Sequence, residues 1–196
     1  MKQHRHIILH KPAGYLSQLV THQQKQNRKR LLNDLHEFPD DIMVVGRLDY
    51  YSEGLLLLTT DGRLSNYIRS KRVEKEYYTE VDGKITDDAI ARLKEGIDIS
   101  INGSKYTTLP CQVKRLEPPP QNIPPLMNTR VSRHRPTSWV SITITEGKFR
   151  QVRKMTAAAG FPTLRLIRAR IGNIWLHDLP PGEIMEVDEF ELNTSS

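Results

Sequence analysis

The sequence predicts an α+β fold, and the order of its elements is the main reason. Segments with strand-like apolar patterns and amphipathic helical segments follow one another irregularly, which disfavours the strict strand–helix repeat of a doubly wound sheet. The length of 196 residues suits one large domain or two subdomains that share a core. A composition of 37% hydrophobic and 27% charged residues is typical of a globular chain in water.

The first part of the chain predicts strands that are interrupted by turns and short helices. "HIILHKPAG" indicates a strand that ends at a Pro-Gly turn, and "RLLNDLHEF" indicates a short helix that stops before Pro39. "DIMVVGRLD" and "GLLLLTTDG" read as buried strands, the second closed by an Asp-Gly turn. The expected elements are strands at 6–10, 41–49 and 54–62, a mobile loop at 21–30, and helices at 30–38 and 63–70.

The remaining chain predicts further strands, two helices and an insertion. Thr86 is a suitable N-cap for a helix over 87–95, because Asp87 and Asp88 would lie in its positive first turn and Gly96 would close it. A Pro- and Arg-rich insertion at 117–137 reads as a loop within the domain, since too little chain follows to fold alone. The other elements are strands at 74–83, 138–147, 163–172 and 184–192 and a helix at 148–160.

The charge distribution predicts a polyanionic partner. The net charge is +6, and between Arg130 and Arg170 the chain carries ten basic residues and a single acid, Glu146. Nucleic acid is the simplest partner for such a block, and the solvated surface of a merely basic protein is the alternative. The single cysteine, Cys111, excludes an internal disulfide and favours a reducing cytoplasm. The longest aliphatic run, Leu55 to Leu58, is too short to span a membrane.

Asp49, in "VVGRLDYYSEGLLLLTTDG", is the candidate catalytic residue. It reads either as an ordinary turn aspartate or as a positioned carboxylate that an arginine keeps ionised, able to act as nucleophile or base. A two-carboxylate hydrolase pairing Asp49 with Glu53 is a weaker alternative. No zinc-protease, P-loop or dinucleotide motif occurs. His4, His6 and His10 lack acidic or thiol neighbours, so no metal site is expected.

Ordered motifs resemble those of the pseudouridine synthases of the RsuA/RluA superfamily. They are "HKPAG", "GRLDYYSEGLLLLTTDG", "EKEYYTEV", "EGKFRQVRKM" and "GFPTLRLIR". The closest resemblance is to the single-domain branch, because no N-terminal S4 RNA-binding domain precedes "HKPAG" and "PTSW" follows the insertion. The resemblance implies one catalytic domain over 1–196, with a mixed, mainly antiparallel sheet flanked by helices and an active-site cleft across the sheet.

The resemblance also implies an activity and a set of site residues. The chain would isomerise a uridine of 23S rRNA to pseudouridine in the cytoplasm, as a monomer without cofactor or metal, on naked rRNA or a pre-50S particle. A non-catalytic rRNA-binding assembly factor is the alternative. Asp49 would be catalytic. The supporting residues would be Arg153, Tyr77, Arg47, Lys75, Leu48 and Val152, and the RNA-binding residues would be Lys11, Arg150, Lys154, Arg165, Arg168 and Arg170.

Overall fold

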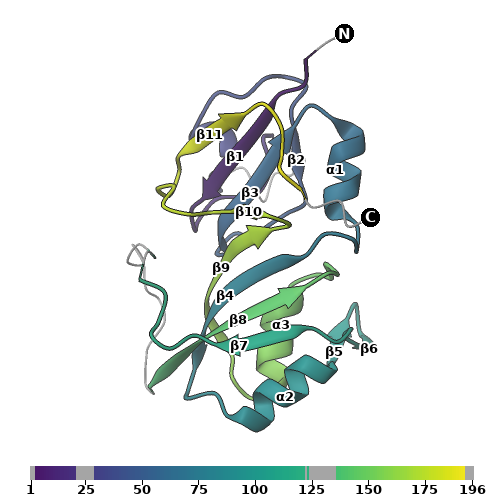
Figure 1. Ribbon diagram of the computed structural model, residues 1–196, viewed down its shortest axis with the longest axis vertical. Coiled ribbons are helices and arrows are strands. Elements are labelled where there is room, and N and C mark those ends of the chain that lie inside the picture. The colour runs from purple at the N-terminus through teal and green to yellow at the C-terminus, as the bar shows by residue number, and fades with distance from the viewer. Residues whose placement is uncertain (1–2, 21–28, 122, 124–135, 193–196) are drawn as a thin grey trace. The chain divides into compact units, whose positions relative to one another are not determined.

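The computed structural model describes residues 3–20, 29–121, 123 and 136–192, and the chain forms two compact units (Figure 1). The first unit comprises Met1–Val73 and Arg168–Ser196, and the second comprises Glu74–Ile167. The predicted mobile loop at 21–30 and insertion at 117–137 fall largely outside the described residues. Among the described helices, none has both the length and the apolar character needed to cross a bilayer.

The sheet of the first unit is built around strand β3 (Glu53–Thr59), which is buried along its whole length. β1 (His6–Lys11) lies between β11 (Ile184–Val187) and β3, as Figure 1 shows, and β2 (Met43–Val45) also pairs with β3. All three pairings are antiparallel. The end of β9 (Thr163–Ile171) belongs to this unit and pairs with β10 (Ile174–Trp175).

The four consecutive leucines of β3 supply two cores, because successive side chains of a strand point to opposite faces. Leu55 and Leu57 belong to one buried cluster, which also contains Ile68 of helix α1 (Gly62–Arg69). Leu56 and Leu58 belong to a second cluster on the other side. The continuous apolar run is therefore what a strand needs when both faces of its sheet are covered.

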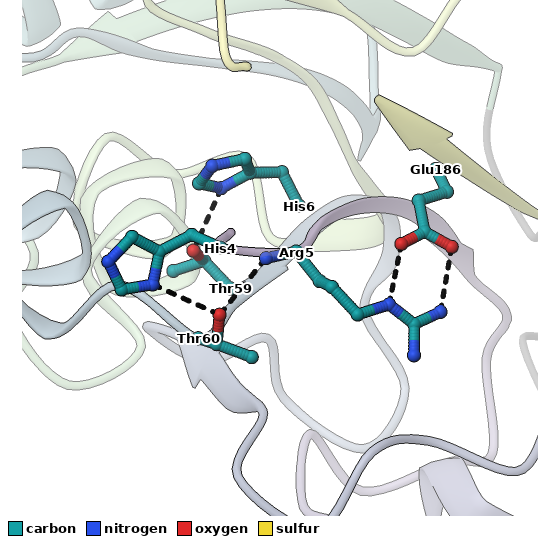
Figure 2. A network of polar contacts seen from close by, with 6 residues as sticks. All are labelled: His4, Arg5, His6, Thr59, Thr60 and Glu186. Atoms are coloured by element: carbon teal, nitrogen blue, oxygen red, sulfur yellow. Dashed lines mark hydrogen bonds and ion pairs between the residues drawn. The ribbon is translucent and has the colours of Figure 1, made fainter. Parts of the chain in front are cut away.

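A polar network joins the N-terminal end of β1 to the neighbouring strands (Figure 2). The imidazole of His6 lies 2.9 Å from the hydroxyl of Thr59, and the Thr60 hydroxyl accepts from the Arg5 amide at 3.0 Å. Arg5 also binds the carboxylate of Glu186 on β11 through two hydrogen bonds of 2.6 and 2.8 Å. No group of three or more His, Cys, Asp or Glu residues suited to a metal occurs in the described part of the chain.

The second unit packs two helices on a sheet. β8 (Thr137–Ile144) lies between β4 (Lys75–Asp82) and β7 (Gln112–Arg115), and both pairings are antiparallel. Its buried core includes Val81 and Ile142 of the sheet, Leu93 of α2 (Asp87–Glu95) and Met155 of α3 (Gln151–Ala158). A separate hairpin joins β5 (Asp98–Ile101) to β6 (Ser104–Thr107).

The structure confirms the helix predicted over 87–95 and changes two others. The Thr86 side chain accepts from the Ala89 amide at 3.2 Å, as an N-cap should. The helix predicted over 148–160 begins later, because Arg150 adopts a left-handed conformation with φ of 54°. The helix predicted over 30–38 is wrong: only a 3-10 turn (Leu32–Asp34) forms, and Asp34 accepts from the Leu31 amide at 2.7 Å.

Candidate active site

Asp49 lies in the loop 46–52 that connects β2 to β3, here called the Asp49 loop. The strand predicted over 41–49 is shorter in the structure, where β2 ends at Val45. The backbone then turns at Gly46, whose φ is +72°. Ser52 closes the next turn by donating its amide to the Asp49 carbonyl at 3.0 Å. The Asp49 side chain is half-buried, so a group that reaches the loop can contact it.

Two residues of one segment near the start of the chain, Gly14 and Ser17, fix the Asp49 loop. The buried hydroxyl of Ser17 donates to the Leu48 carbonyl at 2.9 Å and accepts from the Leu48 amide at 2.9 Å. The Gly14 amide donates to the Tyr50 carbonyl at 2.7 Å. The residues on both sides of Asp49 are thus held by hydrogen bonds, which limits where its carboxylate can lie.

Three charged side chains of the first unit, Asp49 among them, interact electrostatically with Lys11 at the end of β1. We call Lys11, Asp49, Glu53 and Arg168 the Lys11 cluster. Lys11 is 0% exposed, and its ammonium donates to the Pro12 carbonyl at 2.9 Å. Glu53 and Arg168 are also buried, and the Arg168 guanidinium donates to the Leu55 carbonyl at 2.7 Å. Three members of the Lys11 cluster are therefore shielded from water, whereas Asp49 is only half-buried.

Burial sets the protonation of Lys11. It lowers the pKa of the Lys11 ammonium to about 7, against the opposing attraction of Glu53 and Asp49, and the positive charge of Arg168 lowers this pKa further. The pKa of about 7 means that Lys11 can exchange a proton near neutral pH. Sequence patterns identified Lys11 only as an RNA-binding candidate, and its place in this cluster was not predicted.

Several predicted RNA-binding residues are buried. Lys11, Arg165 and Arg168 are 0%, 6% and 4% exposed, so a phosphate could reach them only if the surrounding chain opened. Arg150 is exposed, while Lys154 and Arg170 are half-buried. Of the six predicted RNA-binding residues, these last three are therefore the ones that a phosphate can contact without such an opening.

The predicted supporting residues are divided between the two units. In the first unit, Leu48 is buried and Arg47 is exposed. The second unit brings Tyr77 of β4 and Val152 of α3 into one core cluster. Lys75 and Arg153 belong to the same two elements and are half-buried. Asp49 and Arg153 lie in different units, and their pairing stays a prediction.

The loop that leads into α3 is anchored by Glu146, which sequence analysis did not select. This buried carboxylate accepts hydrogen bonds from the Tyr106 hydroxyl, from the Leu109 amide at 2.9 Å and from the Gln151 side chain at 2.6 Å. Burial acts to raise the pKa of Glu146, but the hydrogen bonds from Tyr106, Leu109 and Gln151 outweigh it and lower this pKa. The sequence signal for Glu146 is that it is the single acid between Arg130 and Arg170.

Comparison with known proteins decides the family. The family model described as RNA pseudouridylate synthase matches residues 5–158. The chain belongs to this family. It is 40% identical over 179 residues to ribosomal large subunit pseudouridine synthase E of Xanthomonas axonopodis pv. citri (strain 306), covering 89% of this chain and 90% of that protein. It is 38% identical over 185 residues to the synthase E of Vibrio parahaemolyticus serotype O3:K6 (strain RIMD 2210633), covering 92% and 73% respectively.

A solved structure agrees with the sequence comparisons. A crystal structure of a pseudouridylate synthase has a TM-score of 0.73 and 26% identity, covering 95% of this chain and 71% of that one. The resemblance inferred from the motifs, the α+β pseudouridine synthase fold and the assignment as an RNA pseudouridine synthase are thereby confirmed.

Proposed function

We propose that the chain converts a uridine of 23S rRNA to pseudouridine, with Asp49 as the essential carboxylate. The substrate is supported by two relatives whose names specify the large ribosomal subunit. The observation that supports Asp49 most is the double hydrogen bond between Ser17 and Leu48, which fixes the residue preceding it. Two neighbouring hydrogen bonds add to this support, since Gly14 donates to the Tyr50 carbonyl and Ser52 donates to the Asp49 carbonyl.

The proposed reaction is an isomerisation within the RNA chain. The N1–C1′ bond breaks, the base turns, and C5 bonds to C1′; C5 loses its proton and N1 gains one, so the mass is unchanged. Asp49 acts either by attacking C1′ or by removing the C2′ proton. Deuterium at C2′ distinguishes the two roles in single-turnover reactions, since a primary isotope effect is expected only when the C2′–H bond breaks.

The supporting residues are proposed from the motifs. Arg153 would pair with Asp49 and hold it ionised, while Tyr77 would lie against the target base. Arg47, Lys75, Leu48 and Val152 would complete the surroundings of the uridine. A double variant with exchanged charges, Asp49→Arg with Arg153→Asp, tests the pairing. If the two side chains interact, this double variant should bind RNA better than either single variant. The comparison needs only binding, so it holds even where catalysis is lost.

The free energy of RNA binding must offset the cost of taking the target uridine out of its helix. Taking a base out of a helix costs a few kcal/mol, and least at a loop or bulge. We assign the phosphate contacts to Arg150, Lys154 and Arg170. The logarithm of affinity should then fall with the logarithm of salt concentration by about 0.7 for each phosphate neutralised on single-stranded RNA. An affinity that does not change with salt contradicts this assignment.

The test uses 23S rRNA transcript labelled with tritium at uridine C5, as naked RNA and within pre-50S particles. The wild type should release tritium and leave a nucleoside of unchanged mass, whereas Asp49→Asn and Asp49→Ala should release none. Asp88→Asn, an exposed acid on α2, is the matched control and should retain activity. Sedimentation of the active protein tests the proposed monomer.

The alternatives give different products. A ribosome assembly factor would bind the transcript without releasing tritium, and a hydrolase would release free uracil. Normal activity in both Asp49 variants would remove Asp49 from the mechanism while leaving the family assignment intact.

A further inference from the structure

An aromatic and cationic surface adjoins Asp49 in the first unit, and the activity described above does not use it. Its members come from three segments and are Tyr15, Lys29, Arg30, Tyr50 and Tyr51, which we call the tyrosine patch. Tyr50 and Tyr51 directly follow Asp49 in the chain. Tyr51 is 64% exposed, and Lys29 and Arg30 are exposed as well.

Specific contacts hold the tyrosine patch together. The rings of Tyr50 and Tyr51 meet edge to face, with centroids 4.9 Å apart. The Lys29 ammonium lies 5.2 Å from the centroid of Tyr50, and the Arg30 guanidinium carbon lies 5.5 Å from that of Tyr15. Such cation–π contacts contribute about 0.5–1 kcal/mol each at exposed sites.

The backbone connects the tyrosine patch to the Asp49 loop. Tyr15 forms a parallel bridge with Arg30, and the Leu16 amide donates to the Arg30 carbonyl at 2.9 Å. The Gly14 amide donates to the Tyr50 carbonyl at 2.7 Å. The ring that is most exposed is therefore two residues from the carboxylate and attached to the same fixed loop.

The chemistry of this surface selects its occupant. A ring that is 64% exposed presents much of its face to water, and any base of an unstacked nucleotide can stack on it. The exposed cations Lys29, Arg30 and Arg47 complement the phosphates that precede and follow such a base. Asp34 is the acid that faces Arg30, and it already accepts a hydrogen bond from the Leu31 amide.

We propose that Tyr51 stacks on an unpaired base next to the target uridine, while Lys29 and Arg30 bind the flanking phosphates. This inference rests on the proposed function, because it places the target uridine at Asp49. Stacking on Tyr51 would hold open the strand on one side of the target. It would therefore favour a uridine in a loop or bulge over one in a continuous helix.

The experiment measures RNA binding without turnover, in the Asp49→Asn background. The probes are a single-stranded decauridylate and the same length of chain carrying abasic sites. Tyr51→Ala should weaken binding of decauridylate by about 5- to 150-fold, the range measured for loss of one stacked base, and should not change binding of the abasic chain. Tyr51→Phe is the matched control, since it keeps the ring, and its affinity should stay within about twofold.

The cations are tested by the salt dependence of the same binding. Lys29→Gln and Arg30→Gln should each reduce the slope of log affinity against log salt by about one phosphate equivalent, with bases present or absent. Equal loss on both probes for Tyr51→Ala, or an unchanged affinity for decauridylate, would overturn the stacking role. Binding of polyglutamate with the same affinity as decauridylate would show a surface for acidic chains instead.

Failure of this inference is separable from failure of the proposed function. Tritium release by the wild type tests the function, whereas the binding comparison needs no catalysis. An active wild type with an insensitive Tyr51→Ala variant rejects only the tyrosine patch. An inactive wild type whose Tyr51→Ala variant loses binding only to decauridylate rejects only the reaction.

Discussion

The hydroxyl of Ser17 both donates to the carbonyl of Leu48 and accepts from its amide, each at 2.9 Å. Ser17 thus binds the backbone of the residue before Asp49 at two points, from a segment that is distant in sequence. Such a link restricts both the position and the orientation of the peptide that carries the carboxylate. The position of Asp49 is therefore determined partly by a serine that belongs to none of the family motifs identified here.

Removal of this hydroxyl should reduce both the stability of the fold and the activity. Ser17→Ala leaves a buried amide and carbonyl without their partner, which costs about 1–3 kcal/mol of unfolding free energy. A displaced carboxylate should lower kcat by roughly 10- to 100-fold. Urea unfolding and tritium release measure the two effects. Ser65→Ala, at a buried serine of α1, is the control, and equal kcat values in both variants would contradict the prediction.

Lys11 should make the stability of the protein depend on pH. Its folded pKa of about 7 lies below the ordinary value of 10.5, so between these pH values the unfolded chain binds more protons than the folded chain. The free-energy cost of burying the charged Lys11 ammonium is full below about pH 7. This cost decreases as pH rises, because the folded-state ammonium loses its proton. The stability of the wild type relative to Lys11→Met should therefore rise by up to about 1.4 kcal/mol per pH unit.

Urea unfolding of the wild type and of Lys11→Met, at several pH values from about 6 to about 9.5, measures the difference in their stability. This range covers the pH values over which the folded Lys11 loses its proton. Lys84→Met, at an exposed position, controls for the loss of a lysine elsewhere. A constant difference between wild type and Lys11→Met across this range would show that Lys11 keeps the same charge in both states.

Glu146 should contribute stability at neutral pH and lose this contribution in acid. Its folded pKa is lowered below the ordinary 4.5, so its contribution is present above that pH and is lost as pH falls through the folded pKa. Glu146→Gln replaces an acceptor oxygen by a donor facing other donors, which should cost about 1–3 kcal/mol at pH 7. Thermal melts from pH 7 to about pH 3 should show the two proteins converging.

The exposed residue Glu95 on α2 is the matched site for this comparison. Glu95→Gln should change the unfolding free energy by no more than about 0.5 kcal/mol. If Glu146→Gln is equally mild, the three hydrogen bonds that Glu146 accepts do not stabilise the fold.

Gly54 should tolerate no side chain. An added Cβ would lie 2.4 Å from the carbonyl oxygen of Arg168 and 2.7 Å from its amide nitrogen, and the φ of Gly54 is +103°. Gly103, in the turn between β5 and β6, also has a positive φ of +83° but nothing within 4 Å of an added Cβ. Both alanine variants are strained, but only Gly54→Ala also forces apart two backbone segments.

Gly103→Ala should cost about 1–3 kcal/mol from strain alone. Gly54→Ala should cost several kcal/mol more, or prevent folding, as measured by urea unfolding and by soluble yield. Similar losses in the two variants would mean that the approach of Arg168 to Gly54 relaxes without cost.

Local patterns predicted the elements whose determinants are adjacent in sequence. Thr86, the acids after it and Gly96 defined α2, because an N-cap and a C-terminal glycine act within a single helix. The same kind of signal marks the hairpin of β5 and β6, where the adjacent residues Asn102 and Gly103 both have positive φ. Neither the 3-10 turn at Leu32–Asp34 nor the late start of α3 followed from apolar periodicity.

The sequence by itself determined the family, the α+β fold and Asp49 as the candidate carboxylate, because motif order and residue pattern are properties of the linear chain. Tertiary structure alone decided which charges are buried and what holds the Asp49 loop. Ser17 and Lys11 contact that loop from the start of the chain, and Arg168 interacts with Lys11 from β9. Burial shifts the pKa of Lys11 to about 7 only once such distant segments exclude water. Desolvation depends on everything packed around a group, so spacing along the chain cannot reveal it.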